Sequence, residues 1–364
     1  MDERERLIDD FIIANGWGDA RRIDMGGDAS IRSYIRLVKP DGTKAIVMNA
    51  PLDEEEIVCT PEMSEAERIA AGYCAHRRTA ASRVDAFVCI GEFLHQAGFT
   101  VPEIHAFNVT DGLALLGDLG EGQYWSLLQQ ANKDEEAMYE AATDVLVKLA
   151  GVKVPQVLEY NGASWPMLSY DAVAMDCEAD MFIDWFAEHH CGLTVDDAVR
   201  GAYRAAWHQM YKHLETDSPV LIIRDYHSPN IMWLPEKQGQ ARAGVIDFQD
   251  AVTGHAAFDV QFLFNDARRD VNPAIAKKML QRYLAATQVD ETSFMNAYHV
   301  FKALNNARIC GIFCRLNYRD GKAGYIKHLP RVQNFVLDSL KHPACAPLAD
   351  WFKTYLPDVL KEAA

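Results

Sequence analysis

A short polar loop between two apolar stretches carries the residues best suited to chemistry. In this loop, RDYHSPN, Asp225 precedes Asn230 by five positions, and Asp247 ends a later apolar stretch. Phosphoryl transfer depends on positioned groups and charge neutralisation rather than on covalent help from the protein. An Asp can orient the attacking hydroxyl and accept its proton, while an Asn and a second Asp supply the hard oxygen ligands that Mg²⁺ prefers. The pattern therefore favours a kinase, although the Asp–x4–Asn spacing alone also fits polar residues that cap turns.

The elements that position this loop differ between the two parts of the chain. The first part alternates short apolar stretches with glycine turns, as antiparallel strands do. Its expected elements are a helix at 3–14, a glycine turn at 26–30, strands at 31–38 and 45–48 around the Asp41-Gly42 turn, a helix at 84–97, and strands at 103–108 and 113–116. From about Tyr124 onward the spacing is helical, interrupted once by short strands within 219–247, the last of them at 244–247.

These patterns predict an α+β fold with two lobes. The N-terminal lobe, residues 1–118, is small, β-rich and expected to bind a nucleotide, and residues 62–82 are predicted to be an insertion within it. The C-terminal lobe, residues 119–364, is larger and mainly helical, and we expect it to hold the catalytic and substrate-binding residues.

Several segments resemble the aminoglycoside phosphotransferase family, small-molecule kinases with a protein-kinase-like fold. The resemblance is carried by GGDASIRSYIRL, LALLGDLGEGQYW, IRDYHSPNIMWLPE and AGVIDFQDAVTGHAAFDV. A later stretch, NNARICGIFCRLNYRDGKAGYIKHLPRV, resembles a bacterial subgroup that phosphorylates the anomeric hydroxyl of N-acetylmuramate and N-acetylglucosamine in cell-wall sugar recycling. The resemblance implies ATP and Mg²⁺ as cofactors and a small amino sugar as the acceptor.

The resemblance also implies roles for individual residues around the polar loop. Asp225 corresponds to the catalytic base, and Asn230 and Asp247 correspond to the metal ligands. Asp259 corresponds to a helix residue that fixes the backbone of the catalytic loop. His227 corresponds to a loop histidine and is expected near the substrate, although a turn-stabilising role fits it equally well.

The nucleotide site is expected to combine backbone groups of the glycine turn with a cation. Its candidate residues are Gly26, Gly27 and Ser30 in the turn, Arg32 and Lys44 as cations, and Asp118 at the hinge. Kinases commonly end their third strand with a Lys that holds the phosphates, but this strand ends at Asn49 without one. Strand alternation places Arg32 and Arg36 on one side of their strand, and Arg32 is the preferred replacement.

Substrate recognition is expected to involve two basic segments of the C-terminal lobe. Its candidates, together with His227, are Asp266, Arg268, Arg308 and Arg315. Arg308 and Arg315 are seven residues apart and so share one helix face, where they suit the carboxylate of a muramic acid. A solvated basic helix face is the alternative interpretation.

The net charge leaves the choice of substrate open. The 364 residues include 36 Lys and Arg against 52 Asp and Glu, a net charge of −16 that argues against binding nucleic acid through a basic field. Residues 53–67 and 171–197 carry seven and eight acids with no Lys or Arg, whereas residues 301–333 carry seven Lys and Arg against one Asp. The basic stretch suits an anionic sugar, while the acidic stretches keep an aminoglycoside-like or choline-like acceptor possible. The absent strand lysine also suggests a third alternative, a catalytically silent nucleotide-binding regulator.

Cysteine usage and the first residues bear on the compartment. The eight cysteines form no Cys-x-x-Cys pair, and the charged segment MDERERLIDD is unlike a signal peptide. No apolar run approaches the roughly 20 residues needed to span a bilayer. We therefore expect a cytoplasmic protein with no membrane partner, and the sequence leaves its oligomeric state open.

Overall fold

The protein forms two compact units, each built from segments that are distant in the sequence. The computed structural model describes residues 3–27, 32–52, 57–80, 82–130 and 134–361. The first unit consists of Met1–Val145, Val152–Leu168 and Ser228–Ala251, and the second of Leu146–Gly151, Ser169–His227 and Val252–Ala364. The lobe boundary between residues 118 and 119 stays a prediction, because compactness alone does not define lobes.

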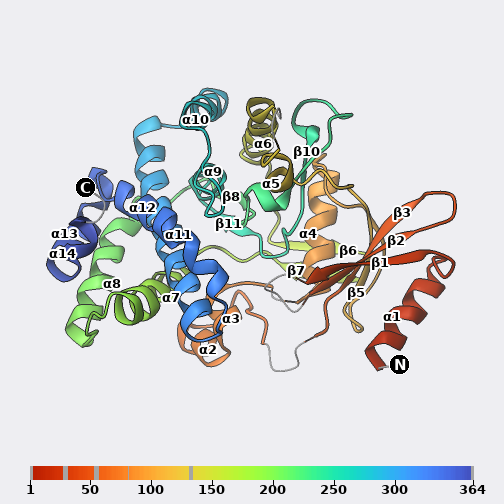
Figure 1. Cartoon of the computed structure of the whole chain (residues 1–364), viewed down its shortest axis with the longest axis horizontal. Helices are drawn as coiled ribbons and strands as arrows, with labels where there is room; N and C mark the ends of the chain where they lie inside the picture. The colour runs from red at the N-terminus through yellow and green to blue at the C-terminus, as the bar shows by residue number, and fades with distance from the viewer. Residues whose placement is uncertain (1–2, 28–31, 53–56, 81, 131–133, 362–364) are drawn as a thin grey trace. The chain divides into compact units, whose positions relative to one another are not determined.

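A five-stranded antiparallel sheet dominates the first unit (Figure 1). Its spatial order is β1-β2-β3-β5-β4. The strands are β1 Arg21–Gly27, β2 Ser33–Val38, β3 Lys44–Asn49, β4 Ile104–Asn108 and β5 Leu113–Gly117. The hairpin predicted at Asp41-Gly42 is confirmed, since β2 and β3 pair on either side of it. The glycine turn predicted at 26–30 lies partly outside the described residues, and β1 extends through Gly27.

Helix α1, Glu3–Ala14, covers one face of this sheet, as its predicted amphipathic pattern requires. Ile8 and Ile12 pack with Val47 and Leu115 in one apolar cluster. Successive strand residues point to opposite faces, so the neighbours of Val47 and Leu115 face away from α1. The sheet thus has one face closed by α1 and a second face available to other elements of the unit.

The remaining elements of the first unit are short, apart from two helices. They are α2 Glu65–Ala70, α3 Tyr73–Arg77, α4 Val84–Gln96, α5 Tyr124–Leu127, α6 Glu135–Leu149 (whose last turn belongs to the second unit), β6 Val157–Tyr160, β7 Ala163–Pro166, the 3₁₀ turns η2 Ser228–Asn230 and η3 Gly239–Arg242, β9 Ile231–Trp233 and β10 Ala243–Val245. Helices α2 and α3 fall within 62–82, whose status as an insertion stays a prediction.

The hairpin β6–β7 corrects the prediction that the chain after Tyr124 is interrupted only once by strands. The two strands pair antiparallel around Asn161-Gly162, both of which have positive φ, 45° and 86°. Asn-Gly is the preferred pair for a two-residue hairpin turn. This turn signal was available in the sequence and was outweighed by the helical spacing on both sides.

The second unit is mainly helical. Its elements are α7 Ala172–Met181, the π-helix η1 Phe182–His190, α8 Asp197–Tyr211, β8 Val220–Ile222, β11 Val252–Gly254, α9 Ala257–Phe264, α10 Pro273–Thr287, α11 Glu291–Tyr318, η4 Ala323–His328, α12 Leu329–Ser339, η5 Pro343–Cys345, α13 Ala346–Tyr355 and α14 Pro357–Lys361. The 28-residue α11 packs against α7, η1, α9 and α12 and forms the centre of this unit. The predicted α+β class, with a β-rich N-terminal region and a mainly helical remainder, is confirmed.

A close backbone contact fixes α11 against the end of α7, and we predict that Gly311→Ala disrupts it. A Cβ at Gly311 would lie 1.9 Å from the carbonyl oxygen of Met181, so the helices would have to separate. We expect a loss of about 3 kcal/mol in the free energy of unfolding, measured by urea denaturation. The matched control is Gly201→Ala at an exposed position of α8, where no atom lies within 4 Å of the added Cβ. That change is expected to stabilise by about 0.5–1 kcal/mol, and equal effects at the two sites would contradict the prediction.

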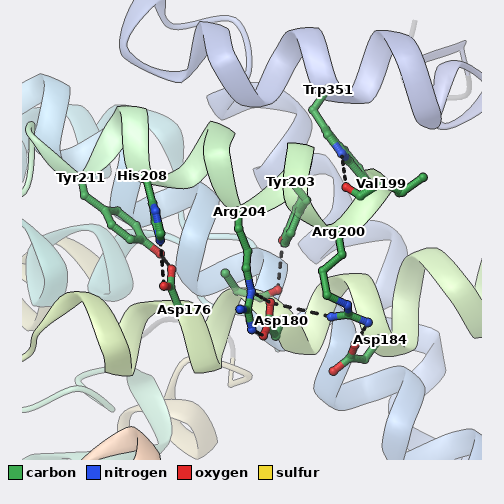
Figure 2. A network of polar contacts seen from close by, with 11 residues as sticks. Asp176, Asp180, Asp184, Val199, Arg200, Tyr203, Arg204, His208, Tyr211 and Trp351 are labelled. Carbon is green, nitrogen blue, oxygen red and sulfur yellow. Dashed lines mark hydrogen bonds and ion pairs between the residues drawn. The ribbon is translucent and has the colours of Figure 1, made fainter. Parts of the chain in front are cut away.

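Most acids of the stretch 171–197 form ion pairs between helices or cap a helix (Figure 2). Acids spaced four residues apart on α7 and η1 face basic residues spaced four apart on α8. The pairs are Asp176 with His208, Asp180 with Arg204, and Asp184 with Arg200. Asp171 and Asp196 accept backbone N–H groups as the N-caps of α7 and α8. These five carboxylates hold helices together and do not form a general acidic surface.

Within the part of the chain that the structure describes, no helix is long and apolar enough to cross a membrane.

Candidate active site

A cavity of about 660 Å³ lies in the first unit, on the face of the sheet opposite α1. Its apolar wall includes Ile46, Leu116 and Phe87, and Phe87 stacks on Phe248 with ring centroids 4.7 Å apart. Its polar lining includes Arg32, Arg36, Asp118, Asn230 and Asp247. An apolar wall beside a few convergent polar groups is typical of small-molecule binding pockets.

The two predicted metal ligands meet at this cavity. The side-chain amide of Asn230 donates to Asp247 Oδ2 over 3.3 Å, and the backbone N–H of Ile246 donates to the Asn230 carbonyl over 3.1 Å. The strand predicted at 244–247 ends earlier, at Val245, and Asp247 has a φ of 59°. This left-handed conformation is uncommon for a residue other than glycine and occurs where surrounding contacts impose it. It takes Asp247 out of the strand and lets its carboxylate meet Asn230.

Asn230 and Asp247 fit a nucleotide-bound Mg²⁺. Among the described residues, no group of three or more His, Cys, Asp or Glu is arranged to hold a metal ion. Mg²⁺ in phosphoryl-transfer sites needs no such cage, because the phosphates and water supply most of its ligands beside one or two protein oxygens. Rotation of the Asn230 amide would present its oxygen in place of its nitrogen.

Two arginines line the cavity, as strand alternation predicts for residues four apart. Arg32 donates to Asp247 Oδ1 over 2.9 Å, and Arg36 pairs with Asp118 over 2.7 Å. Burial opposes the charge of Arg32, but the nearby carboxylates, Asp247 first, raise the pKa of the guanidinium above its usual value. Lys44 is exposed and is not among the residues that line the cavity. The cavity is therefore lined by two arginines, and the role of Arg32 as replacement for the missing lysine stays a prediction.

Asn49, the last residue of β3, does not take the place of the missing lysine. Asn49 binds the guanidinium of Arg4 on α1 and donates to Ser33, whereas the cavity is lined by Ile46. By alternation, Met48 shares the face of Ile46. By the same alternation Lys44 lies on this face, but it is exposed and does not line the cavity, so Ile46 is the β3 side chain that lines it.

The glycine turn is only partly visible. Gly26 has a φ of 77°, which favours glycine, and a Cβ there would meet no atom within 4 Å. Gly27 is the last residue of β1, and Ser30 lies outside the described residues. The roles of Gly26, Gly27 and Ser30 toward phosphates therefore stay predictions.

The second unit holds the predicted base, Asp225, beside a buried charge network. Glu178 on α7 is fully buried, accepts from Arg224 and Tyr170, and lies 3.9 Å from the guanidinium of Arg308. That guanidinium also lies 3.9 Å from Asp225 Oδ1. Burial first, and then the charge of Glu178, raise the pKa of Tyr170 well above its usual value, so its hydroxyl keeps the proton that it donates.

Asp259 holds the backbone before Asp225, as the resemblance to the kinase family implies. The Asp259 carboxylate accepts the backbone N–H groups of Ile223 and Arg224 over 2.6 and 3.0 Å. Arg224 has a φ of 72°, a strained conformation that these contacts and its ion pair with Glu178 sustain. Asp225 follows directly, so these contacts also restrict the position of the predicted base.

Three predicted substrate residues form a second cluster in this unit. Asp266 is fully buried and accepts the backbone N–H of Arg268, whose guanidinium lies 3.5 Å from His227 Nδ1. His227 stacks on Phe262 with centroids 5.1 Å apart, and its backbone N–H donates to the Asp225 carbonyl. Burial lowers the pKa of His227, with Asp266 opposing the shift, which favours the neutral form of the imidazole.

Most of the predicted substrate residues lie close to the predicted base, Asp225, but one of them lies further along α11. Arg308 contacts Asp225, and His227 bonds its backbone. Arg315 is half-buried and lies seven residues further along α11, about 10 Å along the helix axis. Arg308 is buried, which rules out the alternative of a solvated basic face at that position.

Sequence reasoning missed two residues of the site. Glu178 stood among acids that looked like a charged surface, and Gln249 donates to Asp247 Oδ1 over 3.1 Å. One signal pointed to a buried acid without identifying it. Arg224 follows an apolar strand, and a buried arginine requires a charged partner.

The chain belongs to the phosphotransferase enzyme family, whose model matches residues 26–298. The predicted enzyme class, a phosphotransferase, is thereby confirmed. The sequence is 42% identical to an N-acetylmuramate/N-acetylglucosamine kinase of Caulobacter vibrioides over 98% of this chain and 97% of that protein. It is 27% identical to a protein of the same name from Pseudomonas putida over 95% and 92%. The crystal structure of choline kinase LicA from Streptococcus pneumoniae shares the fold with a TM-score of 0.57 at 11% identity, over 93% of this chain and all of that one.

Proposed function

We propose that the protein transfers the γ-phosphoryl group of ATP to the anomeric hydroxyl of N-acetylmuramate or N-acetylglucosamine, in the cytoplasmic recycling of cell-wall sugars. The observation that carries the proposal is the loop in which Asp225 and Asn230 are five residues apart, with Asn230 bonded to Asp247 in the cavity. Base and metal ligands of these types suit phosphoryl transfer to a hydroxyl. The 42% identical relative gives the substrate its name.

In the proposed reaction, Asp225 orients the acceptor hydroxyl and takes its proton. The acceptor oxygen forms a bond to the γ-phosphorus while the bond from that phosphorus to the bridging oxygen of ADP breaks. Asn230 and Asp247 would hold Mg²⁺, which would supply neutralisation of the charge on the phosphates. Two contacts keep the base in one place. The guanidinium of Arg308 lies 3.9 Å from Asp225, and Asp259 holds the preceding backbone. Fixed placement of this kind supplies much of the rate gain in phosphoryl transfer.

The charge distribution favours the sugar over a cationic acceptor. Asp176, Asp180 and Asp184 pair with residues of α8 (Figure 2). Glu178 is buried between two arginines, Arg224 and Arg308. An aminoglycoside or choline-like acceptor needs carboxylates that are accessible to it. This stretch therefore gives the cationic alternative little support. A silent regulator is also less well supported, because Asp225, Asn230 and Asp247 are all present.

The test is an ADP-release assay with a panel of acceptors at equal concentration. We expect turnover with N-acetylmuramate and N-acetylglucosamine and none above background with choline or an aminoglycoside. The sharpest control is the methyl glycoside of N-acetylglucosamine, which keeps every hydroxyl except the anomeric one and should be inert. Turnover of the methyl glycoside would contradict the proposed position of transfer, and turnover of the cationic acceptors alone would contradict the proposed substrate class.

A further inference from the structure

The carboxylate of Asp247 is already surrounded by hydrogen-bond donors within the first unit. Arg32 and Gln249 donate to Oδ1 over 2.9 and 3.1 Å, and Asn230 donates to Oδ2 over 3.3 Å. The Arg32 side chain is only 10% exposed, against 32% for Asp247. A charge-assisted bond with one partner largely removed from water is stronger than a surface ion pair.

This contact competes with the role proposed for Asp247. A divalent cation on Oδ1 and a guanidinium hydrogen-bonded to the same oxygen would lie within a few ångströms of each other, where like charges repel strongly. The guanidinium therefore has to leave Oδ1 when a metal binds there. Arg32 also lines the cavity, as does Arg36, whereas Lys44 of β3 does not. A planar fork of donors is well matched to phosphate oxygens.

We propose that Arg32 is an exchangeable cation: it neutralises Asp247 until a metal–nucleotide complex binds, and then transfers to the nucleotide phosphates. The inference rests on the proposed role of Asp247 as a metal ligand. Its consequence is coupling between the two ligands, because nucleotide draws Arg32 away from Asp247 and so favours the metal, and the metal favours nucleotide by the same factor. The metal alone should bind weakly.

The test measures the two ligands separately on the full-length protein. Mn²⁺ binding without nucleotide is followed by electron paramagnetic resonance, and ADP binding in EDTA is followed by calorimetry. Arg32→Ala should tighten nucleotide-free Mn²⁺ binding by about tenfold, because a competing positive charge is lost. The same variant should weaken metal-free ADP binding by about tenfold, because a charged phosphate contact is lost. Changes of opposite sign are not expected from a residue that only supports the fold.

Two further variants make the result decisive. Arg32→Gln keeps a long polar side chain without the charge, and should also tighten Mn²⁺ binding. Arg36→Ala removes the other cavity arginine, which pairs with Asp118, and should leave nucleotide-free Mn²⁺ affinity within about twofold. Unchanged or weaker Mn²⁺ binding in both Arg32 variants, in a protein that still binds ADP with metal, would overturn the exchange alone. A wild-type protein that binds no ADP would overturn the proposed function, and the exchange with it.

Discussion

Asp225→Asn is expected to lower turnover by about a thousandfold while ADP affinity stays within about twofold of the wild type. An amide has the size of the carboxylate but cannot accept the proton of the attacking hydroxyl, and a positioned base contributes roughly a hundredfold to ten-thousandfold. Asp225 is not among the residues that line the cavity, so nucleotide binding should persist. Steady-state ADP release measures the first quantity and calorimetry the second.

The matched control for this change is Asp320→Asn in the same unit. Asp320 is exposed and pairs with its neighbour Arg319, beyond the end of α11. A pair of this kind contributes little, so turnover should stay within about twofold of the wild type. If Asp225→Asn retained a tenth or more of the activity, or if both variants lost activity equally, Asp225 would not be the base.

The largest effect on stability is expected from Glu178→Gln. Glu178 is fully buried, and its charge is shared by Arg224 and Arg308. Removing one partner leaves buried cations without compensation, which costs about 3–5 kcal/mol in the free energy of unfolding. Urea denaturation with an unchanged m-value would show the loss as a lower midpoint.

Asp180→Asn, two residues away on α7, is the comparison for that variant. Asp180 pairs with Arg204, whose side chain is 45% exposed, so the pair is partly solvated. We expect a loss below about 1 kcal/mol. If both changes lowered the free energy of unfolding equally, burial of the Glu178 network would not be the source of its stability. The ion pairs of Figure 2 would then contribute as much as that network.

Local patterns predicted most of the fold because they are decided within a few residues. The α1 helix has the predicted bounds, since its apolar residues repeat at helical spacing over residues 3–14. The β2–β3 hairpin follows from Asp41-Gly42 and the alternation on both sides. The β6–β7 hairpin was missed although Asn161-Gly162 carries the same kind of signal, because the helical spacing on both sides of it outweighed that signal.

The site was predictable where its residues lie on one loop and unpredictable where they come from distant helices. Asp225 and Asn230 were singled out by their spacing on one loop together with the strand that leads to Asp247, and their roles stay predictions. Glu178 is 46 residues from its partner Arg224, and nothing in the sequence pairs the two. The acidic stretch misled for the same reason, since the bases that neutralise it lie on α8, 16 residues or more away. A count of the acids in one stretch of sequence does not show which residues they face in the structure.

Identification of the product distinguishes transfer of a phosphoryl group to the anomeric hydroxyl from transfer to any other hydroxyl. The protein, ATP, Mg²⁺ and N-acetylmuramate are incubated together, and the product is examined by ³¹P–¹H correlation NMR. We predict one new phosphate resonance correlated with the anomeric proton of the sugar, formed in step with ADP. A phosphate correlated with the C6 protons, or ADP formed without any phosphorylated sugar, would contradict the account.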